Sequence, residues 1–290
     1  MGEPLDDKEE EKQKEHEQQQ QQSPANCSNS DSKKKRKRKE VAIFGNYRHY
    51  YGYRISQDLD EDPRLKVMKK EWFEGKDCLD IGCNSGIITI TIAKKFSCRS
   101  ILGVDIDRAR IDDAHWSLKK IMKRSFNMQG EKVNQSKKSA TELQSELQRD
   151  FSGNSGGDLS DIVSFQKGNF VQSWHPPENT YYHAILCLSV TKWIHLNWGD
   201  DGLLALFSKV WMLLQPGGVF ILEPQPWISY SKNRLVSQTA SDNYQNMKIG
   251  PEDFQDILLD KIGFRSVENI TSSLPDSKSG FNRPILAFWK

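Results

Sequence analysis

The sequence predicts an α/β fold in which a mostly parallel sheet is covered by helices on both faces. From Lys76 onward, short apolar runs alternate with longer amphipathic segments, and a turn of small residues, GCNSG, follows the first run. Strands that alternate with helices in this way form parallel sheets, because each connection crosses a face of the sheet as a helix. Ligands of such sheets bind beyond the carboxyl ends of the strands, so the residues after each strand are the candidates for function.

The first half of this region gives two strands and two helices. DCLDI (77–81) is short and apolar enough for a buried strand, and SILGVDID (100–107) is the second expected strand. IITITIAKKF (87–96) has the length and position of a helix, although its β-branched residues lower its intrinsic helix propensity. Another helix is expected from about residue 108 to residue 123.

The same alternation continues in the second half. HAILCLSV (183–190) and VFILEPQPW (219–227) are expected strands, and DGLLALFSKVWMLL between them is an amphipathic helix. QPGG (215–218) places a proline and two glycines where that helix has to stop. The other expected strands are DIVSFQKGNF (161–170) and an antiparallel pair near the C-terminus, GFRSVENI (263–270) and RPILAFWK (283–290).

Two polar stretches interrupt this pattern. Residues 1–40 combine an acidic start, a glutamine run and the basic run KKKRKRK (33–39). Such a composition buries too little apolar surface to offset the entropy of ordering, so we expect a disordered tail. Residues 123–160 are also polar and lack apolar periodicity, which indicates a flexible insertion. We therefore expect one domain over residues 41–290 that contains this insertion.

The composition argues against several protein classes. No run of about 18 apolar residues and no signal peptide is present, so neither membrane spanning nor export is expected. The five cysteines include no C-x-x-C pair, which indicates a reducing compartment without a disulfide framework or a metal site. The basic run at 33–39 is the kind of cluster that nuclear import receptors read, so we expect a nuclear location.

The turn after the first strand has the pattern D-x-G-x-x-x-G, formed by Asp80, Gly82 and Gly86. A glycine there lets the backbone approach a ligand closely. Asp105 follows about 20 residues further on, where nucleoside-binding α/β domains place an acid that accepts hydrogen bonds from ribose hydroxyls. The motif resembles the cofactor site of S-adenosylmethionine-dependent methyltransferases, which implies a Rossmann-like class I methyltransferase fold. Asn169 and Phe170 would then hydrogen-bond and stack on the adenine.

The segment after the strand at 183–190 indicates the methyl acceptor. Enzymes of this class that methylate amines of bases often carry [DNS]-P-P-[YFW] there, whereas this chain has LSVTKWIHLNW (188–198). That segment contains no proline pair, and Lys192 stands where an acceptor for the amine hydrogen is needed. A cation favours an anionic methyl acceptor, and Arg48 and Arg54 support the same conclusion.

Five stretches together resemble the methylphosphate capping enzymes of the Bicoid-interacting family. They are GNYRHYYGYR (45–54), DIGCNSG (80–86), GNF (168–170), CLSVTKWIHLNWGD (187–200) and EPQPW (223–227). The resemblance implies a seven-stranded sheet with a C-terminal antiparallel strand pair. It also implies methyl transfer from S-adenosylmethionine to the 5′-terminal (gamma) phosphate of small non-coding RNA. The expected partners are a small RNA with a 5′-phosphate end and RNA-associated proteins; we expect a monomer and no membrane.

The resemblance also implies roles for individual residues. Tyr50, Arg54 and Lys192 would position the phosphate without a general base, and His195 and Trp198 would contact the RNA end. The stretch 45–54 would close over both ligands as a lid. The residues expected to contact S-adenosylmethionine are Tyr51, Arg64, Asp80, Gly82, Cys83, Asn84, Gly86, Asp105, Ile106, Asn169, Phe170 and Leu188.

Two alternatives remain open at this point. A carboxylate acceptor on a small molecule or a protein would also need cations and no general base. A protein that binds and shelters an RNA 5′ end, with methylation secondary, would use the same cations but would not need Gly82, Gly86 and Asp105. Arginine and lysine would also serve a monophosphate end as well as a triphosphate end.

Overall fold

The computed structural model describes residues 42–48, 62–136, 158–271 and 283–290. Several expectations lie outside these residues. They concern the tail at 1–40 with its basic run, residues 137–157 of the insertion, and the roles of Tyr50, Tyr51 and Arg54.

A mostly parallel sheet forms the centre of the described domain, and the predicted fold class is confirmed. Its seven strands have the order β3-β2-β1-β4-β5-β7-β6. The first five pair in parallel, whereas β7 pairs antiparallel with both β5 and β6, as expected for the C-terminal pair. The strands are β1 (Asp77–Ile81), β2 (Ser100–Asp105), β3 (Val163–Lys167), β4 (Tyr182–Leu188), β5 (Leu214–Glu223), β6 (Ser266–Asn269) and β7 (Leu286–Trp289).

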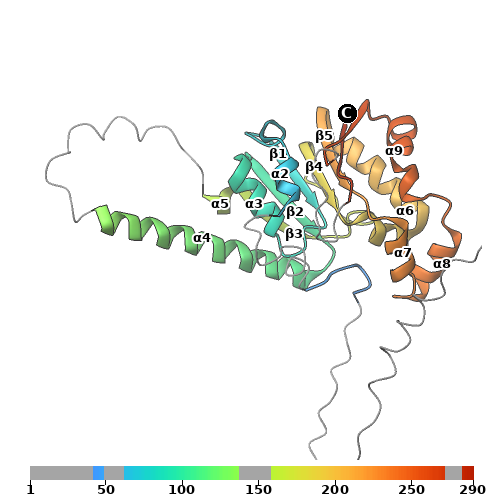
Figure 1. Cartoon of the computed structure of the whole chain (residues 1–290), viewed down its shortest axis with the longest axis horizontal. Coiled ribbons are helices and arrows are strands. Elements are labelled where there is room, and N and C mark those ends of the chain that lie inside the picture. Colours follow the sequence, from blue (N-terminus) through green and yellow to red (C-terminus); the bar gives the residue numbers. More distant parts are fainter. Residues whose placement is uncertain (1–41, 49–61, 137–157, 272–282) are drawn as a thin grey trace, which may run out of the picture. The chain divides into compact units, whose positions relative to one another are not determined.

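Helices cover both faces of the sheet, and the strand residues alternate between two apolar clusters (Figure 1). Cys78 of β1 packs in the cluster formed with α3 (Ile87–Phe96) and α4 (Arg108–Ser136), whereas Leu79 packs in the cluster formed with α6 (Thr191–Leu213). This alternation is what a strand buried on both faces requires, because successive side chains point to opposite sides.

Shorter helices that were not predicted from the sequence surround this frame. The helices α2 (Arg64–Val67) and η1 (Lys70–Trp72) precede β1, and α5 (Leu159–Ile162) leads into β3. After β5 come α7 (Trp227–Asn233), α8 (Gln238–Asn246), η2 (Pro251–Asp253), α9 (Phe254–Asp256) and η3 (Ile257–Ile262). In the described ranges, no helix combines the length and the apolar composition needed to cross a membrane.

The strands predicted at 161–170, 263–270 and 283–290 are shorter in the structure, the strand predicted at 219–227 ends at Glu223, and three larger differences from the prediction concern α4, α6 and the start of β5. The helix expected to end near residue 123 continues to Ser136, because its buried stripe is followed by a polar segment that contains no proline. The helix expected at 201–214 begins already at Thr191 and is kinked at Gly199, whose φ of 63° and ψ of −165° are not helical. QPGG lies inside β5 rather than before it, and the pairing of β4 with β5 shifts register there.

The register of the parallel strands brings the predicted site together. β1 pairs with β2 on one side and with β4 on the other, so Ile81, Asp105 and Leu188 end neighbouring strands at one edge of the sheet. The residues that follow these strands therefore face a common space.

Candidate functional site

A cleft lies at the carboxyl ends of β1, β2 and β4 and is partly closed by residues 44–46. Most of the residues that the sequence predicted for the cofactor line it. Among those in the described ranges, Cys83 and Gly86 do not. The predicted residues in the wall are Arg64, Asp80, Gly82, Asn84, Asp105, Ile106, Asn169, Phe170, Leu188 and, from the RNA set, Trp198.

The glycine turn is shaped by two positions where a side chain would clash. Gly82 has a φ of 75°, and a Cβ there would lie 2.3 Å from Cγ2 of Val190. Gly86, with a φ of 72°, begins α3, and its Cβ would lie 2.5 Å from the ring of Phe165. The missing side chain at Gly82 thus leaves room for Val190 in the cleft wall. The missing side chain at Gly86 lets α3 pack closely against Phe165 of the sheet. The Cys83 side chain also points into the core, with 1% of its surface exposed.

Asp105 is oriented by backbone amides. One carboxylate oxygen accepts from the amide of Asn84 and the other from the amide of Asp107, both at 2.9 Å. Burial raises the pKa of Asp105, while the two amide donors oppose that shift. A carboxylate oxygen has room for more than one hydrogen bond, so Asp105 can still accept from a diol such as the hydroxyls of a ribose.

Asp80 lies deeper in the same wall and is 3% exposed. The Thr89 hydroxyl donates to one of its oxygens at 2.6 Å. Burial raises the pKa of Asp80 to about 6; Thr89 and the Arg64 charge counteract this, whereas the charge of Asp105 adds to it. Two carboxyl groups thus share one wall, and burial raises the pKa of both.

The turn after β3 supplies the apolar wall of the cleft. Phe170 stacks on Trp174 with ring centroids 5.2 Å apart, and Lys209 of α6 donates to the Phe170 carbonyl at 2.8 Å. The Asn169 side chain accepts from the amides of Val171 and Gln172 at 3.1 and 3.2 Å. Its amide nitrogen also donates to the Gln172 side chain at 2.9 Å, so the expected hydrogen bond to a base would have to use the second amide hydrogen or the backbone.

Residues 42–48 form a strap across the mouth of the cleft. Phe44 stacks on Trp198 at 5.8 Å with an interplanar angle of 10°. Asn46 donates to Asp107, and the Tyr47 carbonyl accepts from Asn84 at 3.3 Å. The first residues of the expected lid stretch thus bridge the glycine turn and α6, while its residues from 49 onward lie outside the described ranges.

Lys192 stands at the start of α6, between wall residues Val190 and Trp193. Its Nζ donates to the Ser229 hydroxyl of α7 at 2.9 Å and lies 4.2 Å from the Trp193 ring centroid, while Gln225 accepts from its backbone amide at 3.1 Å. Burial lowers the pKa of Lys192 to about 7, and repulsion by Arg283 adds to the effect. The side-chain hydrogen bond of Lys192 thus goes to a neutral hydroxyl rather than to a carboxylate, an arrangement that favours an anionic ligand.

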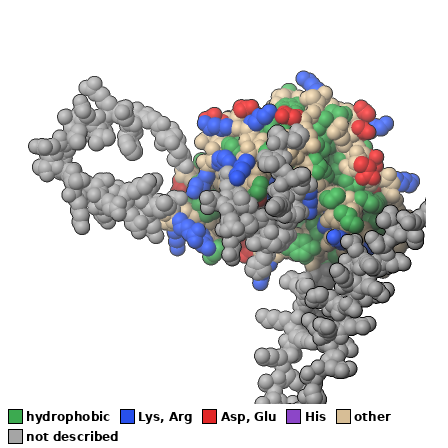
Figure 2. Space-filling model, in the orientation of Figure 1, with side chains coloured by type: hydrophobic (Ala, Val, Ile, Leu, Met, Phe, Trp, Pro, Cys, Tyr) green, Lys and Arg blue, Asp and Glu red, His purple; other side chains and the backbone are tan. Residues whose placement is uncertain are grey.

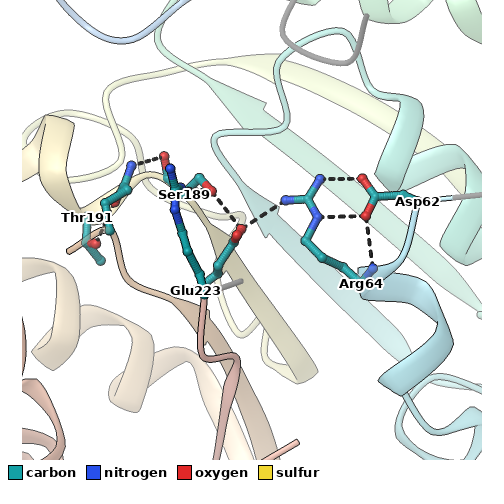
Figure 3. Close-up of polar contacts among 7 residues, drawn as sticks. Asp62, Arg64, Ser189, Thr191 and Glu223 are labelled. Carbon is teal, nitrogen blue, oxygen red and sulfur yellow. Dashed lines mark hydrogen bonds and ion pairs between the residues drawn. The ribbon is translucent and has the colours of Figure 1, made fainter. Parts of the chain in front are cut away.

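A buried ionic network connects Asp62, Arg64 and Glu223 (Figure 3). Arg64 donates from Nε and Nη2 to Asp62 at 2.9 and 2.7 Å, and from Nη1 to Glu223 at 3.0 Å. The Ser189 hydroxyl donates to Glu223 at 2.6 Å and accepts from Arg283 at 3.1 Å. The network joins α2, β4, β5 and the segment before β7, and through Arg64 it reaches the cleft wall.

Most of the residues that hold Lys192 and Arg64 in place were not predicted from the sequence. Glu223 could have been found, because it ends a strand of the parallel sheet as Asp105 does. Gln225 lies in the same stretch, EPQPW, whereas Ser229 and Arg283 carry no local signal, since each reaches the site through a tertiary contact.

The position of His195 does not fit the expected contact with RNA. Its side chain is completely buried, its Nε2 lies 2.7 Å from Asp200, and its ring packs against Tyr230 and Phe254. Burial lowers the pKa of His195, and Asp200 opposes this. Asp200 also accepts from the amide of Lys248 at 2.9 Å. We therefore assign His195 to holding the kink of α6 rather than to the cleft.

The sequence of this chain is similar to one protein-family model and to several known methyltransferases and capping enzymes. A family model described as Bicoid-interacting protein 3 (Bin3) matches residues 182–290. A probable RNA methyltransferase of Arabidopsis thaliana is 60% identical over 260 residues, which cover 87% of this chain and 81% of the relative. The U6 snRNA methylphosphate capping enzyme Amus of Drosophila melanogaster is 36% identical over 254 residues, covering 85% of this chain and 74% of the relative. The human 7SK snRNA methylphosphate capping enzyme is 34% identical over 272 residues, and the match covers 85% of this chain and 39% of that protein.

Proposed function

The chain belongs to the Bin3 family, and we propose that it transfers a methyl group from S-adenosylmethionine to the 5′-terminal gamma phosphate of a small RNA. The observation that carries this proposal is Lys192. It presents a largely buried ammonium group beside the cleft, where its side-chain hydrogen bond goes to the neutral Ser229 hydroxyl. A phosphate oxygen is the kind of ligand that would complete this arrangement.

The cleft residues fit S-adenosylmethionine. Asp105 offers a carboxylate oriented toward a diol, Phe170 offers an apolar ring at the wall, and Gly82 allows close approach of the backbone. Bound S-adenosylmethionine would supply an electrophilic methyl carbon on its sulfonium sulfur. The names of the relatives, an RNA methyltransferase and snRNA capping enzymes, favour RNA over a small carboxylate as the acceptor.

The chain's own residues need only position the acceptor. The second ionisation of a terminal phosphate has a pKa of about 6, so the phosphate oxygen is ionised at neutral pH and requires no general base. That oxygen forms the new bond to the methyl carbon while the carbon–sulfur bond breaks and its electron pair stays on sulfur. Lys192 would orient the phosphate for in-line attack, and orientation of this kind contributes about 7–11 kcal/mol in favourable cases. A charge pair that is too strong would weaken the nucleophile, so its role is positioning rather than activation.

The test compares one short RNA with a 5′-triphosphate, a 5′-monophosphate or a 5′-hydroxyl end, incubated with labelled S-adenosylmethionine. We expect label on the triphosphate form, and pyrophosphatase should release that label together with the terminal phosphates. Label on the monophosphate form alone would move the acceptor to the alpha phosphate. Equal labelling of all three RNAs would contradict a phosphate acceptor. Tight RNA binding without any transfer would favour the end-sheltering alternative.

The titration of Lys192 predicts a pH optimum. The ammonium form binds phosphate, and its pKa in the free protein is about 7. Raising the pH through that value removes the charge, so kcat/KM for RNA should fall above about pH 7. Below it, kcat/KM should rise with pH as the terminal phosphate ionises near about 6. Bound phosphate favours the ammonium form, so kcat at saturating RNA should lack the falling limb.

This profile is measured as initial rates across about pH 5.5 to 9 at constant ionic strength. The Lys192→Met variant is the control, because it has no group to titrate and should retain only the rising limb. If kcat/KM fell at the same pH in the parent protein and in Lys192→Met, the group that titrates would not be Lys192.

A further inference from the structure

The solvent face of α4 carries a cluster of cations around an exposed tryptophan. The opposite face packs into the core through Ile111, Ala114 and Leu118. Because side chains three and four positions apart share one face of a helix, the exposed positions that follow form a continuous stripe. We call this stripe the basic face; its members are Trp116, Lys119, Lys120, Lys123 and Arg124.

No acidic side chain balances these cations on the same stretch of helix. Residues 114–130 contain four lysine or arginine residues and no aspartate or glutamate. The two aspartates just before them pair within the first turns of α4: Asp112 lies 3.0 Å from Arg108, and Asp113 lies 2.9 Å from Arg110. The basic face is thus a local excess of positive charge on a chain whose formal net charge is only +2.

Trp116 distinguishes this face from an ordinary solvated helix surface. Its side chain is 61% exposed, and Lys120 lies 4.7 Å from its ring centroid. A large aromatic ring in water beside cations suits a ligand that has both flat rings and negative charge. Nucleic acid has both, since each base offers a face for stacking and each nucleotide carries a phosphate.

The start of α4 ties the basic face to the cleft. The helix begins at Arg108, immediately after Asp107, which bonds the strap through Asn46. With a rise of about 1.5 Å per residue, Trp116 lies about 12 Å and Arg124 about 24 Å along the helix from its start. Figure 1 shows α4 running outward from the sheet, and Figure 2 shows lysine and arginine side chains gathered on the surface where this helix leaves the body.

We propose that the basic face of α4 binds the sugar–phosphate backbone of the substrate RNA downstream of its 5′ end, with Trp116 stacking on a base. This proposal rests on the proposed function, because it takes the cleft to hold the 5′ end of the same RNA. The basic face would supply affinity, whereas Lys192 would position the reacting phosphate.

The first test changes Lys119, Lys120, Lys123 and Arg124 to glutamine together and measures binding of an RNA of about 40 nucleotides at several salt concentrations. Each neutralised phosphate contributes about 0.7 to 0.9 to the slope of log K against log salt, so four lost contacts should lower the slope by about 3. We expect affinity to fall about tenfold or more near physiological salt. The matched control removes the same charge elsewhere, through Lys66, Lys94, Lys261 and Arg265 to glutamine, and should change the slope by less than about 1.

The second test separates this proposal from the catalytic one. With a 5′-triphosphorylated dinucleotide, which is too short to reach the basic face, the quadruple variant should methylate as fast as the parent protein. With the longer RNA its kcat/KM should fall by the same factor as its affinity. If no RNA is methylated by either protein, the proposed function fails, while the salt slopes still decide whether the basic face binds RNA.

Trp116→Ala tests the stacking contact without a change in charge. A stacked base contributes about 1–3 kcal/mol, so we expect RNA affinity to fall about fivefold or more, and Trp116→Phe should restore most of it. Equal slopes for the quadruple variant and its control, together with unchanged binding by Trp116→Ala, would overturn the proposal and leave the basic face as a solvated surface.

Discussion

Replacing Lys192 with methionine is expected to lower kcat/KM for 5′-triphosphorylated RNA by about 30- to 1,000-fold. Lys192 is 5% exposed, so a phosphate that binds there leaves water and depends on the ammonium for compensation. Removing one partner of such a buried charge pair costs about 2–4 kcal/mol, which corresponds to that range of rates. Methionine keeps an unbranched apolar stem, one atom shorter than that of lysine, and loses only the Nζ contacts with the Ser229 hydroxyl and the Trp193 ring.

The measurement pairs steady-state methyl transfer with calorimetric binding of S-adenosylmethionine. Cofactor affinity should stay within about twofold, because Lys192 is not among the residues that line the cleft with Gly82 and Asp105. Lys232→Met is a matched control, since it removes a lysine from the exposed surface of α7 and should leave turnover unchanged. Unchanged turnover in Lys192→Met would show that the phosphate binds elsewhere in the cleft.

The parts of this site that follow from the sequence are those set by the strands. Short apolar strands and the turn residues after them are local features, so the positions of Gly82, Asp105 and Phe170 in one cleft follow once the parallel sheet is recognised. The family resemblance then indicated which residues to expect around the methyl acceptor. Lys192 was expected near the acceptor because it follows a strand, and the structure places it beside the cleft wall.

The remaining contacts depend on segments far apart in the chain. His195 and Lys192 belong to the same short motif, yet packing of Tyr230 and Phe254 buries the histidine completely, and neither of those residues is local to it. The Ser229 contact depends on α7, a short helix without a clear apolar period. Arg64 was expected at the cofactor, and it does line the cleft, but its guanidinium is also engaged by two carboxylates.

Those two carboxylates give the largest expected effect on stability. Arg64→Met should lower the free energy of unfolding by about 3–5 kcal/mol, because it removes the buried guanidinium that pairs with the carboxylates of Asp62 and Glu223. They are 4% and 2% exposed, so water does not compensate (Figure 3). Unfolding of the full chain in urea, followed by circular dichroism, measures the difference as a shift of the midpoint at an unchanged slope.

Two further variants show whether the loss of stability comes from the buried charges around Arg64 or from the loss of any arginine in an ion pair. Arg99→Met removes an arginine that also pairs with an aspartate, Asp77, but whose side chain is 62% exposed. It should shift the unfolding midpoint much less than Arg64→Met does, because exposed ion pairs contribute little to stability. Adding Glu223→Gln to Arg64→Met removes one of the two buried negative charges that Arg64 pairs with and should recover part of the lost stability. If Arg64→Met and Arg99→Met were equally mild, the network would not stabilise the fold, and Arg64 would serve the cleft alone.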